Sequence, residues 1–148
     1  MVKKLLHPQE IQVWYIIPAL RKELTLEMKK LGLDQKTIAK IIGVTEAAVS
    51  QYIKEKRANE VQFDEKTKEE IKKSAQLISQ NGKLLFQEMQ HLLGKALESK
   101  VICKFCLSRN DLPESCDICF KNEPKEDLSG QCSCNSDRHF CQKRDAAI

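Results

Sequence analysis

The stretch DQKTIAKIIGVTEAAVSQYIKEKRAN, residues 34–59, contains two short amphipathic segments on either side of one glycine, and it ends in basic residues. Two helices joined by a tight turn need a small residue where they touch, a glycine where the backbone reverses, and apolar facing surfaces. Ala39 and Gly43 occupy the first two positions, and Thr45 can cap the second helix. The facing apolar residues are Ile38, Ile42, Val44, Val49, Tyr52 and Ile53. The pattern predicts a helix-turn-helix.

The second of these helices has short or hydrogen-bonding side chains on its outer side, which can approach base edges in a DNA major groove. These residues are Glu46, Ala47, Ser50, Gln51 and Lys54, and they are followed by Lys56 and Arg57, which can neutralise phosphates. Residues 1–63 hold 11 Lys and Arg against 7 Asp and Glu, and they contain the whole excess behind the net charge of +4. An ordinary helical hairpin with a solvated face is the alternative. The combined spacing, cap and basic cluster favour binding to double-stranded DNA.

The segments VWYIIPALRKEL (13–24) and LDQKTIAKIIGVTEAAVSQYIKEKRA (33–58) resemble archaeal predicted transcriptional regulators with a lambda-repressor/Cro-type helix-turn-helix. The resemblance covers about residues 8–60. It implies that bases are contacted by Thr45, Glu46, Ala47, Ser50 and Gln51, and phosphates by Gln35, Lys54, Lys56 and Arg57. Glu46 departs from the glutamine expected first in the recognition helix. A carboxylate there can accept a hydrogen bond from cytosine N4 but repels phosphate.

Further helices are predicted before this motif. Pro18 lacks an amide N–H and disfavours helical conformation in the preceding residue, so we expect a kink or two helices, at about 8–16 and 18–31. Trp14 and Tyr15 are expected in the core of the first of these helices.

More helix is predicted after the motif. Residues 64–80 are dense in Glu and Lys but keep one apolar face, and a second apolar stripe follows within residues 83–97. The stripe consists of Leu85, Met89, Leu92 and Ala96. Such a seam packs either on the preceding helices or against a second chain. Because two-fold dimers match two half-sites on DNA, we predict a homodimer through residues 83–97.

The last third of the chain holds all seven cysteines. CKFCLSRNDLPESCDIC, residues 103–119, has two Cys-x2-Cys pairs separated by nine residues, which predicts two tight knuckles that face one another. The predicted metal ligands are Cys103, Cys106, Cys116 and Cys119. Four thiolates satisfy tetrahedral zinc, although an iron–sulfur cluster uses the same ligands. Disulfides rank last, because seven is odd and the chain is expected to be intracellular.

A second group, CSCNSDRHFC (132–141), contains Cys132, Cys134, Cys141 and His139. Three thiolates and an imidazole would complete a second tetrahedral site. Alternatively, His139 is merely exposed and the three cysteines serve an iron–sulfur cluster, an interleaved first site or redox chemistry. Because the chain from Val101 onward has few large apolar residues, we expect an irregular tail that folds only on binding metal.

Several function classes are not supported by the sequence. No apolar run approaches the roughly 20 residues of a bilayer helix, and no cleavage site is evident, so we expect a cytoplasmic protein with no membrane partner. Phosphate-loop, nucleophile-elbow and zincin motifs are absent from the sequence, and an all-cysteine site leaves no coordination position open for water. We therefore expect neither an enzyme nor a small-molecule substrate.

The expected fold is mainly α, in three parts. Residues 1–62 form a helix-turn-helix DNA-binding domain, residues 63–99 a helical connector and dimerisation segment, and residues 100–148 an irregular cysteine-rich metal-binding domain. The expected function is a sequence-specific transcription regulator. Its cysteines would bind structural zinc or an iron–sulfur cluster that senses redox or metal state. The alternative is a zinc-dependent adaptor that binds a protein of the transcription machinery.

Overall fold

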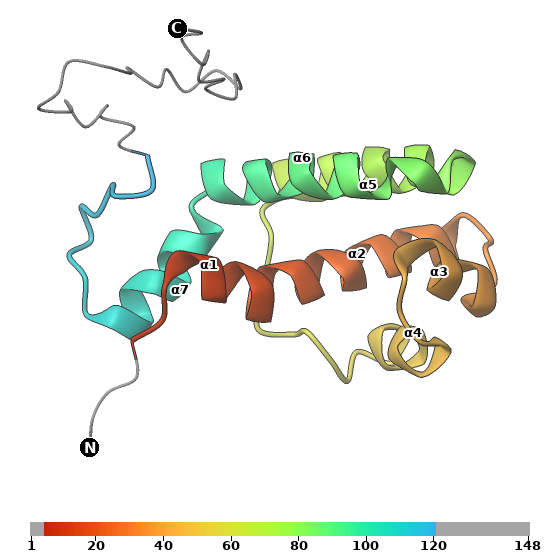
Figure 1. Cartoon of the computed structure of the whole chain (residues 1–148), viewed down its shortest axis with the longest axis horizontal. Helices are drawn as coiled ribbons and strands as arrows, with labels where there is room; N and C mark the ends of the chain where they lie inside the picture. The colour runs from red at the N-terminus through yellow and green to blue at the C-terminus, as the bar shows by residue number, and fades with distance from the viewer. Residues whose placement is uncertain (1–4, 121–148) are drawn as a thin grey trace, which may run out of the picture. The chain divides into compact units, whose positions relative to one another are not determined.

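The structure is a computed structural model that describes residues 5–120 (Figure 1). All regular secondary structure in that range is helical, which confirms the predicted mainly α class. The elements are α1 (Pro8–Ile11), the π-helical turn η1 (Gln12–Ile16), α2 (Ile17–Lys30), α3 (Gln35–Ile42), α4 (Glu46–Ile53), α5 (Glu65–Gln80), the 3-10 turn η2 (Gly82–Leu84), α6 (Leu85–Glu98) and α7 (Val101–Asn110). One compact unit ends at Glu114 and another begins at Ser115. Between residues 5 and 120, no helix is long and apolar enough to cross a membrane.

α1, η1 and α2 follow one another directly and form a helical rod (Figure 1). The predicted interruption near Pro18 takes the form of the π-helical turn, in which the Ile17 N–H donates to the Gln12 carbonyl five residues earlier. Pro18 therefore falls in the first turn of α2. Because proline has no amide N–H, Pro18 cannot continue this series of hydrogen bonds, and it lies directly after the π-helical turn.

The buried face of the rod is the centre of the hydrophobic core. Its large, fully buried apolar residues are Ile11, Ile16, Leu20, Leu24 and Met28. Tyr15 packs against this core, as predicted, but Trp14 is 48% exposed, so its expected core position is wrong. The inward direction of this turn is taken by Ile11 and Ile16, which are both fully buried.

α5 and α6 form an antiparallel pair beside α2 (Figure 1). Ser74 Oγ donates to Glu88 Oε2 at 2.7 Å, and His91 Nε2 lies 3.1 Å from Glu70 Oε2. Hydrogen bonds from Lys73 and from His91 hold the pKa of Glu70 below its usual value. The pairs run in opposite senses along the two helices, which fixes their antiparallel register. The buried apolar residues of α5 are Ile71, Ala75 and Ile78.

The apolar stripe of α6 is covered within the same chain. Leu92 and Ala96 are fully buried, and Leu85 and Met89 pack against the same core at its edge. Their neighbours are α5 and α2. Leu92 and Ala96 are therefore not available for the predicted homodimer seam, and a homodimer through residues 83–97 would have to use other surfaces of this segment. The exposed apolar residue of this helix is Phe86, at 82%.

α7 is a helix in a segment whose composition predicts irregular structure, so that prediction is wrong for Val101–Asn110. The segment has no proline or glycine, and Val101 and Ile102 are buried against the rest of the unit. Phe105 stacks on Tyr15 with ring centroids 5.3 Å apart. α7 packs against α1 and α6. These contacts supply the apolar partners that the local sequence lacks.

Two hydrogen bonds made by one side chain connect the end of α7 to the segment before α1. Asn110 Nδ2 donates to the Leu6 carbonyl at 2.7 Å, and the Leu6 N–H donates to Asn110 Oδ1 at 2.9 Å. The boundary between compact units follows Glu114, whereas the sequence predicts one between residues 99 and 100. Val61 and Phe63, on either side of the other predicted boundary, are buried in one shared core. The first unit therefore packs around one shared core, and not as separate segments divided after residues 62 and 99.

Candidate nucleic-acid interface

α3 is bounded by two local signals that the sequence contains. At its start, Asp34 accepts a hydrogen bond from the Thr37 N–H at 3.2 Å. Hydrogen bonds from Thr37 hold the pKa of the Asp34 carboxyl below its usual value. At its end, Gly43 has φ +74° and the Val44 N–H donates to the Ala39 carbonyl at 3.1 Å. A left-handed residue ends a helix and reverses the chain, which explains the glycine.

α4 begins three residues later with a second cap. Thr45 Oγ1 accepts from the Ala48 N–H at 3.1 Å, as the sequence predicts. Val49 and Tyr52 are buried, and they hold α4 against α2 and α3. The predicted facing residues Ile38, Ala39 and Ile42 are buried on α3. α4 is therefore anchored by its inner side, and its orientation follows from that packing.

The opposite side of α4 faces solvent. Exposed positions include Thr45, Glu46, Ala47, Gln51 and Lys54, while Ser50 is half-buried. Gln35, a predicted phosphate contact, is half-buried at the start of α3. Glu46 stands in the first turn of α4, where the partial positive charge of a helix N-terminus favours a carboxylate. The residues predicted to read bases thus share one accessible helix surface.

A turn with two left-handed residues follows α4. Glu55 has φ +53° and Ala58 has φ +60°. The Glu55 N–H donates to the Tyr52 carbonyl and the Lys56 N–H to the Gln51 carbonyl, both at 3.0 Å, which is the Schellman pattern of helix ends. Each non-glycine residue in this conformation costs roughly 1–2 kcal/mol.

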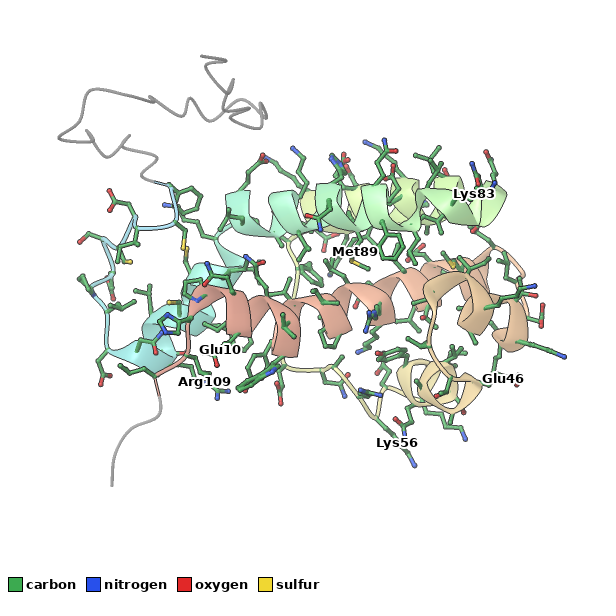
Figure 2. The ribbon with its side chains drawn as sticks, viewed as in Figure 1. Glu10, Glu46, Lys56, Lys83, Met89 and Arg109 are labelled. Atoms are coloured by element: carbon green, nitrogen blue, oxygen red, sulfur yellow. The ribbon has the colours of Figure 1, made fainter. Side chains whose placement is uncertain are left out.

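The same turn carries the predicted phosphate contacts. Lys56 and Arg57 are exposed, and Figure 2 shows the Lys56 side chain extending away from α2. The Arg57 guanidinium lies 5.7 Å from the centre of the Tyr52 ring. A cation over an aromatic face is attracted by the ring, and this contact limits the positions that Arg57 takes.

Two residues that support this surface have no signal in the local sequence. Lys22 Nζ on α2 donates to Asn59 Oδ1 at 2.5 Å across 37 positions of the chain. Asn59 Nδ2 in turn donates to the Glu55 carbonyl. A contact over such a separation depends on how α2 and the turn pack together, so neither residue is predicted from its neighbours.

Comparison of the chain with family models, with curated proteins and with solved structures gives no significant match. The side-chain arrangement and chemistry of α3, α4 and the following turn therefore define the candidate interface.

The four cysteines of the predicted metal quartet are divided between the two compact units, with one pair in each. Cys103 and Cys106 stand on α7, so the predicted first knuckle is instead a helix. Cys103 is half-buried, while Cys106 is 8% exposed and its Sγ accepts from Asn110 Nδ2 at 3.3 Å. The knuckle prediction fails because this Cys-x2-Cys pair sits inside a segment with enough apolar side chains to join the core.

The second unit contains the other pair. Cys116 and Cys119 are both half-buried there, in a turn in which the Phe120 N–H donates to the Asp117 carbonyl at 2.8 Å. Within residues 5–120, no three His, Cys, Asp or Glu side chains are grouped so as to hold a metal ion. The predicted second group, Cys132, Cys134, His139 and Cys141, lies outside the described residues.

Proposed function

We propose that this protein is a sequence-specific DNA-binding regulator of transcription, and that it reads duplex DNA with the outer side of α4. The observation that carries the proposal is the sorting of side chains on that helix: Val49 and Tyr52 are buried, whereas Glu46 and Gln51 are exposed. One side of α4 packs against the protein, and the other side is exposed and carries hydrogen-bonding groups. Such a helix can insert into a major groove. On this proposal α3, its turn and α4 are a helix-turn-helix like that of the archaeal regulators.

The proposed roles follow from side-chain chemistry. Base edges are contacted by Thr45, Glu46, Ala47, Ser50 and Gln51, and phosphates by Gln35, Lys54, Lys56 and Arg57. Gln51 can pair with adenine through two hydrogen bonds, and Glu46 can accept from cytosine N4. The cations position the protein on the backbone without reading sequence. A homodimer on a symmetric operator belongs to the same proposal, through a surface other than the buried stripe of α6.

The proposal is tested by selecting duplexes from a random pool and measuring their affinity by fluorescence anisotropy at several salt concentrations. We expect the selected duplex to bind about 1,000-fold more tightly than a scrambled one, with affinity falling steeply as salt rises. Binding that is absent, or independent of salt, would contradict the proposal. The adaptor function, with the helix-turn-helix as a scaffold, would then be favoured.

Gln51→Ala and Arg57→Ala are expected to weaken binding in different ways. Gln51→Ala should cost about 1–3 kcal/mol on the selected duplex and nearly nothing on a scrambled one, because Gln51 contacts a base. Arg57→Ala should weaken both duplexes alike and lower the salt slope by about one unit, because it neutralises one phosphate. Anisotropy on the two duplexes separates these outcomes. Identical behaviour of the two variants would contradict the assigned roles.

We also propose that the cysteines bind zinc or an iron–sulfur cluster, through Cys103, Cys106, Cys116 and Cys119. Thiolates are the ligands that both groups prefer, and two Cys-x2-Cys pairs supply four. The bound group would stabilise the second unit or report redox state. A second site is proposed at Cys132, Cys134, Cys141 and His139. Sulfur ligation requires loss of the thiol protons, so metal binding should weaken as pH falls.

Cys116→Ser and Cys119→Ser are expected to remove one metal ion or cluster, because each takes away one of four ligands. These two variants are the cleanest, since Cys106 also contributes to the core. Metal analysis and an absorption spectrum of protein purified without oxygen give the readout, and visible absorption distinguishes iron–sulfur from colourless zinc. Ser115→Ala, beside the same pair, is the control. Full metal content in both cysteine variants would exclude this quartet as the site.

A further inference from the structure

Lys22 is an unusual residue in the part of the chain that the structure describes. It is 8% exposed, and the other buried polar residues there, Thr25, Thr67 and Ser74, carry no charge. Its ammonium reaches out of α2 to donate to Asn59 Oδ1 at 2.5 Å. Burying a cationic side chain is costly, so a lysine in this position calls for an explanation beyond packing.

The second half of the contact is the backbone of the turn after α4. Asn59 Nδ2 donates to the Glu55 carbonyl, so the amide of Asn59 bridges Lys22 and the turn. The bridge encloses residues 55–59, with left-handed conformations at Glu55 and Ala58. Non-glycine residues keep such conformations only where the surrounding structure holds them, and such positions cluster at binding sites.

The bridged turn presents two cations. Lys56 and Arg57 lie between the two left-handed residues, and both are exposed. Arg57 is also placed over the Tyr52 ring, 5.7 Å from its centre. One end of the turn is thus fixed by α4, one cation by an aromatic ring, and the other end by Asn59 and Lys22. The turn is therefore ordered before any ligand binds.

We propose that Lys22 and Asn59 are positioning residues that hold the turn at residues 54–59 as a preformed clamp for a phosphodiester of the nucleic-acid backbone. This inference rests on the proposed DNA binding. A flexible pair of long cationic side chains loses conformational freedom on binding, and a clamp built beforehand loses less. The two cations would hold the C-terminal end of α4 against the backbone of one strand, a contact that does not depend on the base sequence.

Asn59→Ala is the decisive variant, because Asn59 is exposed and the change alters no charge. We expect affinity to fall about tenfold on selected and scrambled duplexes alike, since an immobilised contact becomes a mobile one. Gln62→Ala is the matched control: it removes an exposed amide from the same connecting segment and should leave affinity unchanged. Anisotropy on both duplexes measures the effect.

Adding Ala58→Gly to Asn59→Ala separates positioning from stability. Glycine adopts positive φ without steric strain, so the double variant should recover the thermal stability that Asn59→Ala alone loses. It should not recover affinity, because the turn is then unstrained but no longer held. Recovery of affinity together with stability would reduce Asn59 to a structural role and overturn the proposal.

Lys22→Met tests the other end of the bridge, with Lys29→Met as the control for lost charge on the same helix. Lys22→Met should weaken binding several-fold more than Lys29→Met. Equal effects, or an Asn59→Ala variant that binds DNA as the wild type does, would overturn the clamp while leaving DNA binding intact. A wild-type protein that binds no DNA would overturn both the proposed function and the clamp.

Discussion

Leu92→Ala is expected to lower the free energy of unfolding by about 2–5 kcal/mol, because it opens a cavity in the core of a single chain. Leu92 is fully buried, and α6 packs against α5 and α2. The surrounding helices can collapse only partly into the space that the side chain leaves. Chemical denaturation followed by circular dichroism measures the change, and we expect the difference between the variant and the wild type to be the same at every protein concentration.

Phe86→Ala on the same helix is the matched control. Phe86 is 82% exposed, so its truncation removes little packing and should change stability by no more than about 0.5 kcal/mol. An unfolding midpoint that rises with protein concentration, and loses that dependence in Leu92→Ala, would show instead that the stripe joins two chains. That outcome would restore the dimer seam that the heptad-like spacing alone predicts.

Ending the chain at Ser99 is expected to destabilise the first unit severely. The truncation removes Val101 and Ile102, which are buried, and burial of each such side chain contributes about 1.5–3 kcal/mol. It also removes the Phe105 ring that stacks on Tyr15 and the two hydrogen bonds between Asn110 and the Leu6 backbone. Loss of this much burial approaches the whole stability of a small domain. Thermal unfolding of the truncated chain is the measurement.

A chain that ends at Glu114 is the control for that truncation. It keeps α7 and the first compact unit, and it removes the second unit with Cys116 and Cys119. We expect it to unfold near the temperature of the same unit in the full chain. If both truncated chains were equally stable, α7 would not belong to the core, and the boundary predicted between residues 99 and 100 would be the real one.

The position of α7 places two demands on one cysteine. Cys106 is part of the core cluster, with its sulfur accepting a hydrogen bond from Asn110, and Asn110 holds Leu6. In the proposed metal site the same sulfur is a ligand. Cys103, three residues earlier, is half-buried and is not in the core cluster. Substitution of Cys106 should therefore affect the stability of the first unit as well as metal content, whereas Cys116 and Cys119 lie outside that unit.

The candidate interface could be predicted in detail because its signals are local. Asp34 and Thr45 cap their helices through residues three positions on, and Gly43 supplies the left-handed turn between them. Side-chain direction then follows from helical periodicity, which puts Val49 and Tyr52 inside and Gln51 outside. Each of these features depends on neighbours within about one turn of helix, so the sequence alone determined them.

Other features of the fold depend on which distant segments of the chain pack together. Periodicity shows that Leu92 is on an apolar face but not whether α2 of the same chain or a second chain covers it. The helix at Cys103 and Cys106 needed partners nearly a hundred residues away, and Trp14 points outward because its neighbours fill the core. The bridge from Lys22 to Asn59 spans 37 positions. Packing between distant segments carries no local pattern, so the tertiary structure alone decided these points.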